Sequence, residues 1–312
     1  MNQDEVRQHL TGPITSIATP FNRDGSVDYD GLRRQIDHYI DAGSRTMLLT
    51  AGDSQYICLD DDEIAEVTRV TVEQTARRAM VVAADRYLDT GRSIAFAEFA
   101  KRSKADVLMV LPPNWAGSIT PETVAAHYGA VSTVMPVMIV TGLFIPQGAT
   151  FALEAIERSL DECPNVVAIK DDMGGDFARR LSLLAHERVA VFSGGLKVNH
   201  INMWPYGCDG YMSTLITFRP ELTHRYWQAV EAHDLPTMRR IVRDYDLPVF
   251  DYLETVTGGW NAGLHGALEV FGIAQRWRRP PYYSLDDEEM EKLSAFFADK
   301  GMLPGQTIKE NS

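Results

Sequence analysis

The residue of this sequence with the clearest chemical potential is a lysine that closes an apolar run. Lys170 ends the segment Val-Val-Ala-Ile-Lys, whereas the six other lysines lie in predicted helices or in the tail, where solvated amines are expected. Burial of an amine at such a position favours its unprotonated form, which can attack a carbonyl carbon and form a Schiff base. The alternative is a structural lysine that pairs with the carboxylate of Asp171, Asp172 or Asp85. Both interpretations fit the position of the lysine.

Polar and small residues follow the other apolar runs, and they are candidates for the same site. They are Asp53, Asp85, Asn114, Trp115, Thr141, Gly194, Gly195 and residues 212–214. If the runs are parallel strands of a barrel, their carboxyl ends gather at the end where barrel enzymes have their active sites. We therefore expect Lys170 to project into the barrel mouth beside Asp53, Thr141 and Met212. The substrate-binding residues that we predict are Gly52, Asp53, Val140, Thr141, Gly194 and Met212.

The elements that would position these residues alternate in their periodicity. Eight short apolar or β-branched runs are separated by longer segments of helical period, which is the pattern of parallel βα units. Several runs are apolar throughout, as expected for parallel strands that are covered on both faces. The predicted strands span residues 14–21, 46–51, 80–85, 107–113, 135–141, 166–172, 189–194 and 210–214.

Three of the predicted helices have well-defined starts. Asp60 is a predicted N-cap with Glu63 three residues later, which is the pattern of a capping box. Thr120 precedes a proline at the first helical position of another helix. Ser284 precedes an acidic turn and is the predicted N-cap of the last helix.

Eight strands that are each followed by a helix favour a (β/α)8 barrel over a doubly wound open sheet. We predict that residues 1–218 form the barrel and that residues 219–312 form a helical extension packed on it. Breakers at Gly258-Gly259 and Pro280-Pro281 divide the extension. Residues 306–312 are predicted to be disordered.

Composition and charge limit the classes of partner. A formal net charge of -13 opposes binding to nucleic acid. No apolar run approaches the roughly 20 residues of a membrane span, and residues 1–10 lack the apolar core of a secretory signal. The three cysteines, Cys58, Cys163 and Cys208, form no CxxC pair, which favours free thiols in a reducing compartment. The sequence thus predicts a soluble cytoplasmic protein that binds neither nucleic acid nor a membrane.

Motifs along nearly the whole chain resemble those of a known family. They are Thr19-Pro20-Phe21, Asp24-Gly25 with Asp28, residues 167–171, Ser193-Gly194-Gly195, Gly207-Cys208-Asp209-Gly210 and Arg279-Pro280-Pro281. In this order, from about residue 13 to 303, they resemble the dihydrodipicolinate synthase and N-acetylneuraminate lyase family. The resemblance implies a barrel with a carboxy-terminal helical region, usually a homotetramer, without a cofactor or bound metal. It also implies a strand-six lysine that forms an imine with pyruvate or another 2-oxo acid, and Lys170 matches that lysine.

The segment after the second predicted strand departs from the family pattern. The family usually has Gly-Thr-Thr-Gly-Glu there, which holds the keto-acid carboxylate, and residues 51–55 read Ala-Gly-Asp-Ser-Gln. A second register aligns residues 50–53, Thr-Ala-Gly-Asp, with Thr-Thr-Gly-Glu. In either register a hydroxyl of the carboxylate cradle is lost, and Asp53 adds a negative charge.

The proton relay of the family is also missing. Val140 and Thr141 stand where a tyrosine is usual on strand five, and Asn114 and Trp115 replace a tyrosine after strand four. Imine formation still needs an acid or base near the amine. Location alone nominates Asp53, Asp171 or Tyr56, and the alternative for each of them, favoured over catalysis, is a structural or substrate-shaping role.

The leading hypothesis is therefore a cofactor-free lyase, an aldolase or a hydratase, which acts on a small 2-oxo acid or aldehyde through an imine at Lys170. One rival is a metal-dependent barrel lyase in which Asp53, Asp85 and Asp171 bind a divalent cation. Another is a family member that has lost turnover and binds a metabolite as a sensor or scaffold. A homo-oligomer, either a tetramer or a dimer, is expected.

Overall fold

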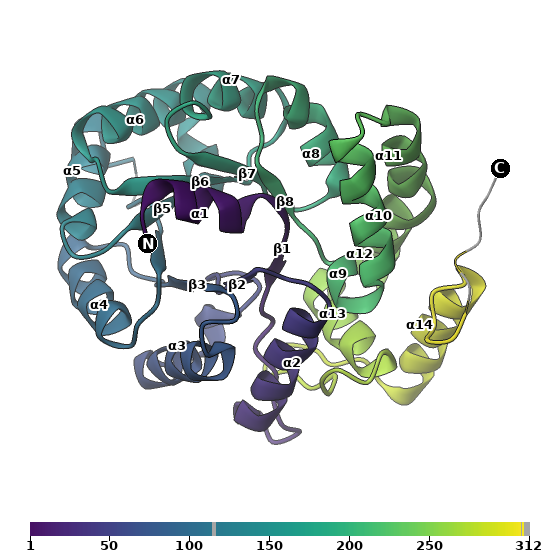
Figure 1. The fold of residues 1–312 in the computed structure, drawn as a ribbon. Helices are drawn as coiled ribbons and strands as arrows, with labels where there is room; N and C mark the ends of the chain where they lie inside the picture. Colours follow the sequence, from purple (N-terminus) through teal and green to yellow (C-terminus); the bar gives the residue numbers. More distant parts are fainter. Residues whose placement is uncertain (114–116, 307, 309–312) are drawn as a thin grey trace.

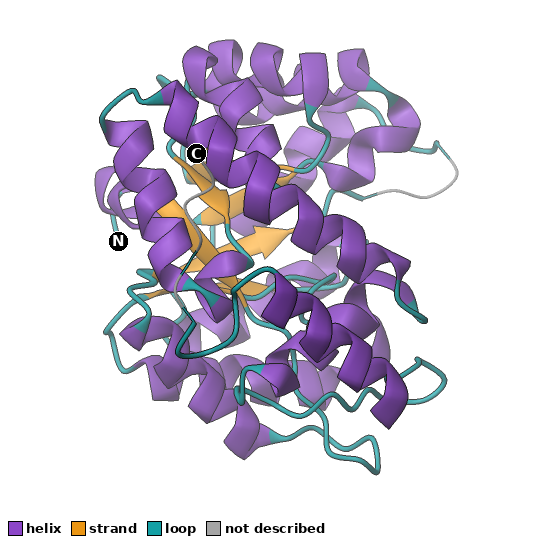
Figure 2. Ribbon diagram, turned by 90° about the vertical axis from the view of Figure 1, so that its right-hand side faces the viewer, coloured by secondary structure: helices purple, strands orange, loops and turns teal. Residues whose placement is uncertain are grey.

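Eight short parallel strands form a closed barrel in the order β1 to β8, which confirms the predicted (β/α)8 fold (Figure 1). The computed structural model describes residues 1–113, 117–306 and 308. The strands are β1 Gly12–Ser16, β2 Thr46–Leu48, β3 Met80–Ala84, β4 Val107–Val110, β5 Val137–Val140, β6 Val166–Asp171, β7 Ala190–Ser193 and β8 Gly210–Met212. Each overlaps a predicted apolar run. Helices surround the strands on the outside (Figure 2). All residues of β3 to β7 are buried, as expected when helices cover the outside of a barrel and side chains fill its inside.

The helices surround the barrel and extend beyond it. A short helix, α1 Gln3–Leu10, contacts β1, β6 and β7 and lies across one end of the barrel in Figure 1. The helices between the strands are α2 Tyr29–Asp41, α3 Asp61–Thr75, α4 Thr90–Arg102, α5 Pro121–Ser132, α6 Ala149–Glu162, α7 Gly175–Ala185 and α8 Lys197–Met203. Short 3-10 turns are η1 Tyr56–Cys58, η2 Gly142–Gln147 and η3 Trp204–Tyr206.

The chain after β8 is helical, as predicted. The elements are α9 Leu215–Phe218, α10 Pro220–Glu231, α11 Leu235–Ile241, a π-helical turn η4 Val242–Asp246, α12 Leu247–Thr255, α13 Gly259–Val270 and α14 Asp287–Asp299. Helix α10 contacts β1, and Leu264 and Phe297 of α13 and α14 belong to the same hydrophobic core as the barrel strands. The division into 1–218 and 219–312 stays a prediction.

The local sequence signals are confirmed at two helix starts and wrong at a third. Capping boxes begin α3 at Asp60 and α5 at Thr120. The N-cap of α14 is Asp286, whose carboxylate accepts from the backbone of Glu289, and not Ser284. The hydroxyl of Ser284 instead accepts a hydrogen bond from the backbone of Arg278. The backbone six residues upstream has therefore taken the hydroxyl that the local pattern assigned to the helix start.

A second correction concerns a lysine that was expected in solvent. Lys197 is only 1% exposed, and its amine lies 2.9 Å from the carboxylate of Asp246 in the π-helical turn. The three cysteines are free. Within the described ranges, no helix has the length and apolarity needed to cross a membrane. The predictions for Asn114 and Trp115, and for most of the tail 306–312, fall outside the described residues.

Candidate active site

A cavity of about 420 Å³ lies at the carboxyl ends of the strands, and Lys170 is in its wall. Four of the predicted substrate-binding residues also line it, namely Gly52, Asp53, Val140 and Met212. Val140 pairs with Lys170 across β5 and β6, which explains why both side chains face the cavity. The expected position of Lys170 at the barrel mouth is therefore observed.

The amine of Lys170 is paired with the carboxylate of Asp172, and both carboxylate oxygens are within hydrogen-bond reach. The lysine side chain is 8% exposed and that of Asp172 is 29% exposed. From the sequence, Asp172 is expected only as a structural partner of the lysine and not as a candidate acid or base. The alternation of side chains along a strand could have identified it, because residues 170 and 172 face the same side.

Asp171 faces the opposite way and supports the wall from behind. Its carboxylate accepts from the hydroxyl of Thr141 at 3.0 Å and from the backbone of Met173 and Gly174 at 3.1 Å each. Burial raises the pKa of Asp171, and these hydrogen bonds oppose the rise. The hydroxyl of Thr141 also accepts from the backbone of Asp172 at 2.8 Å. These contacts fix the position of Asp172 beside the lysine.

Two predicted substrate-binding residues, Thr141 and Gly194, are not in the cavity lining. Thr141 is fully buried behind it, and its neighbour Gly142 takes the place in the wall. A side chain at Gly194 would overlap the carboxylate of Asp172 and would lie 2.8 Å from the carbonyl oxygen of Asp171. Glycine at this position therefore makes room for Asp172.

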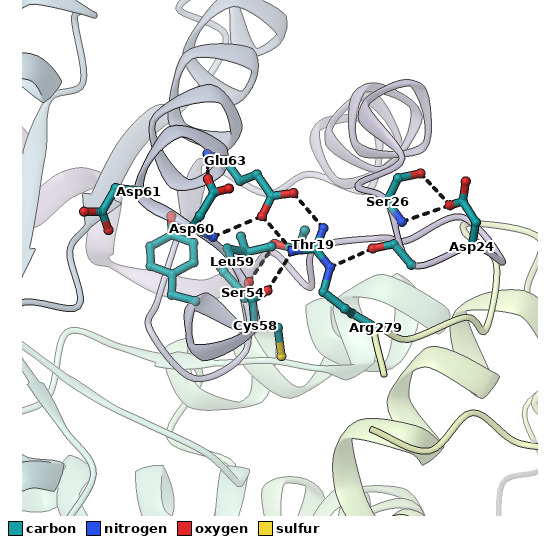
Figure 3. Close-up of polar contacts among 12 residues, drawn as sticks. Thr19, Asp24, Ser26, Ser54, Cys58, Leu59, Asp60, Asp61, Glu63 and Arg279 are labelled. Carbon is teal, nitrogen blue, oxygen red and sulfur yellow. Dashed lines mark hydrogen bonds and ion pairs between the residues drawn. The ribbon is translucent and has the colours of Figure 1, made fainter. Parts of the chain in front are cut away.

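The loop after β2 forms the opposite wall. Thr50 lines the cavity, and its hydroxyl accepts from the backbone of Asp53 at 2.9 Å. The hydroxyl of Ser54 donates to the carbonyl of Ile17 at 2.7 Å, and Thr19 donates to the carbonyl of Ser54 at 2.7 Å (Figure 3). The motif at residues 19–21 thus anchors the loop. Thr50 is the hydroxyl that this loop presents to the cavity.

The Arg279 motif has a positioning role that the structure makes clear. The guanidinium of Arg279 makes two bonds of 2.6 Å to Glu63 at the start of α3 (Figure 3). It also donates to the carbonyls of Gly25 and Cys58 at 2.7 Å each. This ion pair lowers the pKa of Glu63. The contacts join the carboxy-terminal region to the loops around the cavity.

The carboxy-terminal helices complete the cavity with aromatic side chains. Phe250 of α12 and Trp260 of α13 stack with ring centroids 4.5 Å apart, and both line the cavity. Met109, Leu111 and Leu143 add further apolar surface on the barrel side. An apolar wall of this kind excludes water from the amine.

Two residues nominated for chemistry lie elsewhere. Asp85 is fully buried outside the cavity, and the phenol of Tyr56 is buried near the carboxylate of Asp85. No group of three or more side chains in the described part of the chain could hold a metal ion. The three aspartates of the metal hypothesis, Asp53, Asp85 and Asp171, are therefore not brought together, and Tyr56 cannot serve the lysine.

The environment of Asp85 is poor in donors. Neither carboxylate oxygen has a well-formed hydrogen bond within the described residues, and Ser93 and the backbone of Tyr87 and Leu111 only partly offset the effect of burial on its pKa. Burial raises the pKa of Asp85 to about 7. The folded protein therefore binds this proton more tightly than the unfolded chain does.

We expect Asp85→Asn to stabilise the protein at pH 8 by as much as about 4 kcal/mol. The stability that protonated Asp85 provides is fully present below about pH 4 and is lost as the pH rises toward 7. The advantage of the variant should therefore shrink steadily from pH 8 to pH 5. Urea unfolding at several pH values measures it, with the exposed Asp62→Asn as control. An advantage that does not change with pH would contradict the prediction.

The fold and the cavity define a (β/α)8-barrel protein with an amine at the mouth of the barrel. A model of the dihydrodipicolinate synthetase family matches residues 9–300. The chain therefore belongs to the dihydrodipicolinate synthetase family, and it is a lyase of that family.

Relatives and solved structures are similar over nearly their whole length. The chain is 26% identical to a probable 5-dehydro-4-deoxyglucarate dehydratase of Bradyrhizobium diazoefficiens, covering 95% of this chain and 94% of the relative. It is 29% identical to 4-hydroxy-tetrahydrodipicolinate synthase 2 of Streptomyces coelicolor, covering 93% and 95%. The structure of dihydrodipicolinate synthase from Aquifex aeolicus matches with a TM-score of 0.81 at 22% identity, covering 94% and 99%. N-acetylneuraminate lyase from Mycoplasma synoviae matches with a TM-score of 0.78 at 18% identity, covering 94% and 99%.

Proposed function

We propose that the protein is a Schiff-base-forming lyase that acts on a 2-oxo acid or a related carbonyl compound through Lys170. The observation that carries the proposal is the buried amine of Lys170 in the wall of a cavity at the barrel mouth, in direct contact with one carboxylate, Asp172. Relatives named as a dehydratase and a synthase favour a lyase over a binding protein. The cytoplasmic location and the homo-oligomer, a tetramer or a dimer, remain predictions.

In this mechanism Asp172 takes the place of the missing tyrosines as the proton carrier. It accepts a proton from the ammonium of Lys170, and the neutral amine then attacks the carbonyl carbon to form a carbinolamine. Asp172 returns the proton to the carbinolamine hydroxyl, which leaves as water and gives the iminium ion. The iminium withdraws electrons from the neighbouring carbon, so that a carbon–carbon or carbon–oxygen bond can break.

Trapping of the imine tests the proposal. Protein incubated with pyruvate or another 2-oxo acid and then reduced with borohydride should gain the mass of the reduced adduct on the peptide that carries Lys170. Lys170→Ala should gain none, whereas the exposed control Lys292→Ala should react like the wild type. Folded protein that gains no mass with a broad panel of 2-oxo acids and aldehydes would contradict the proposal. That result would favour the alternative hypothesis of a metabolite-binding sensor without turnover, which the missing tyrosines also support.

A further inference from the structure

A second cavity of about 670 Å³ lies beside the candidate active site and shares two residues with it. Ala51 and Gly52 line both cavities, so the two cavities adjoin at this loop. The carboxy-terminal region contributes Asn261, Arg278 and Tyr282 to the lining of the second cavity.

The charges of the two cavities differ. The cavity at Lys170 holds two carboxylates, Asp53 and Asp172, with a single ammonium. The second cavity is lined by two arginines, Arg86 and Arg278, and by no aspartate or glutamate among the described residues. Arg86 is compensated, because its guanidinium lies 2.6 Å from the carboxylate of Asp61. Arg278 is therefore the cation of this cavity that is available to an external anion.

Arg278 is buried without a counter-ion among the residues that the structure describes, which is an unfavourable arrangement unless an anion is supplied. Its side chain is 7% exposed, and its guanidinium donates twice to the amide oxygen of Gln55, at 3.1 and 2.8 Å. No carboxylate of the described residues pairs with it, and burial lowers its pKa. The adjacent Arg279 is the opposite case, since Glu63 compensates it with two bonds (Figure 3).

The surrounding contacts hold Gln55 in a conformation that is unfavourable for it in isolation. Its backbone is left-handed, with φ 56°, a conformation that costs energy for a residue with a side chain. The side chain is buried between Arg278 and His265, and burial and the charge of Arg278 lower the pKa of His265 to about 3. His265 is therefore neutral, and the groups beside the guanidinium head on this side are the amide of Gln55 and the face of the Tyr282 ring.

We propose that the cavity at Arg278 is a binding site for a carboxylate, which comes either from the second anionic group of the substrate or from a separate small acid. The guanidinium supplies the charge, and Asn261 supplies an amide at the same wall. The first source rests on the proposed imine at Lys170, whereas the second does not. In both cases Gln55 leaves Arg278 free for an external anion.

The variant Gln55→Glu tests this site with the smallest change. It keeps the shape and the backbone of the residue and places a carboxylate on Arg278, which should expel an external anion. Arg278→Gln removes the cation and should have the same effect, and the exposed Arg239→Gln is the control. Thermal unfolding checks that each variant is folded, and the midpoint of Gln55→Glu should not fall.

Two measurements distinguish the sources. Borohydride trapping at Lys170 gives the half-saturating concentrations of 2-oxoglutarate, which has a second carboxylate, and of pyruvate, which has only one. If the substrate supplies the anion, both variants should raise the value for 2-oxoglutarate by at least about 10-fold and leave that for pyruvate unchanged. Calorimetry with glutarate, which has no keto group and forms no imine, measures the binding of a separate acid. If a separate acid supplies the carboxylate, wild-type protein reduced with pyruvate should still bind glutarate, and both variants should lose this binding.

The proposal is overturned if the wild type and both variants behave alike in trapping and in calorimetry. Failure of all trapping would contradict the imine at Lys170, but the glutarate measurement on untreated protein would still decide whether Arg278 binds a carboxylate.

Discussion

Replacement of Asp172 by asparagine should slow imine formation by about 100- to 10,000-fold, the range typical of a lost general acid–base group. The carboxylate touches the amine of Lys170, and an amide cannot accept the ammonium proton. The shape of the side chain and its place against Gly194 are retained, so the loss should fall on proton transfer. Timed borohydride trapping with a 2-oxo acid measures the rate of the adduct at Lys170.

Asp176→Asn is the matched control for this prediction. Asp176 lies in α7 on the same segment, and it is exposed and forms an ion pair with Arg180. The control should form the adduct at the wild-type rate. If Asp172→Asn also formed it at that rate across the pH range, Asp172 would only hold the lysine in place, and another proton carrier, for example Asp53, would have to be considered.

The fold was predictable because it follows from local patterns. Apolar runs that alternate with helical segments are properties of short stretches, and so are the capping boxes at Asp60 and Thr120. The position of Lys170 follows from the same patterns, since a strand end in a barrel is also a site wall. The lysine is thus located by sequence alone, and Asp172 was among its three expected carboxylate partners, although it was not expected to act as an acid or base.

The rest of the site depends on contacts between residues far apart in the chain. Gln55 meets Arg278 across 223 positions, and Lys197 meets Asp246 across 49. Nothing in the neighbouring sequence shows which distant side chain will fill the space beside a buried charge. Local sequence therefore suggested solvent for Lys197 and a cavity position for Thr141, and tertiary packing decided otherwise.

Removal of one partner of the buried pair of Lys197 and Asp246 should lower the free energy of unfolding by about 3 to 5 kcal/mol. The two side chains are 1% and 2% exposed, and the carboxylate also accepts from the backbone of Lys197 at 2.8 Å. Asp246→Asn removes the counter-charge of the buried ammonium, and its remaining neighbours are neutral: the amide oxygen of the asparagine, the hydroxyl of Ser213 at 3.5 Å and the faces of two tyrosine rings.

Urea unfolding should therefore show a large loss of stability for Asp246→Asn, and the double variant Lys197→Met with Asp246→Leu should recover most of it. Replacement of both charges by apolar groups removes the cost of burying an unpaired ion, so the pair itself contributes little net stability. The exposed pair of Lys292 and Glu288 provides the contrast, because Glu288→Gln should leave the unfolding midpoint nearly unchanged. A double variant as unstable as Asp246→Asn would show that these side chains are needed for the positions of the π-helical turn and α12. Because α12 carries Phe250, the same variant would then also be expected to lose the closed wall of the Lys170 cavity.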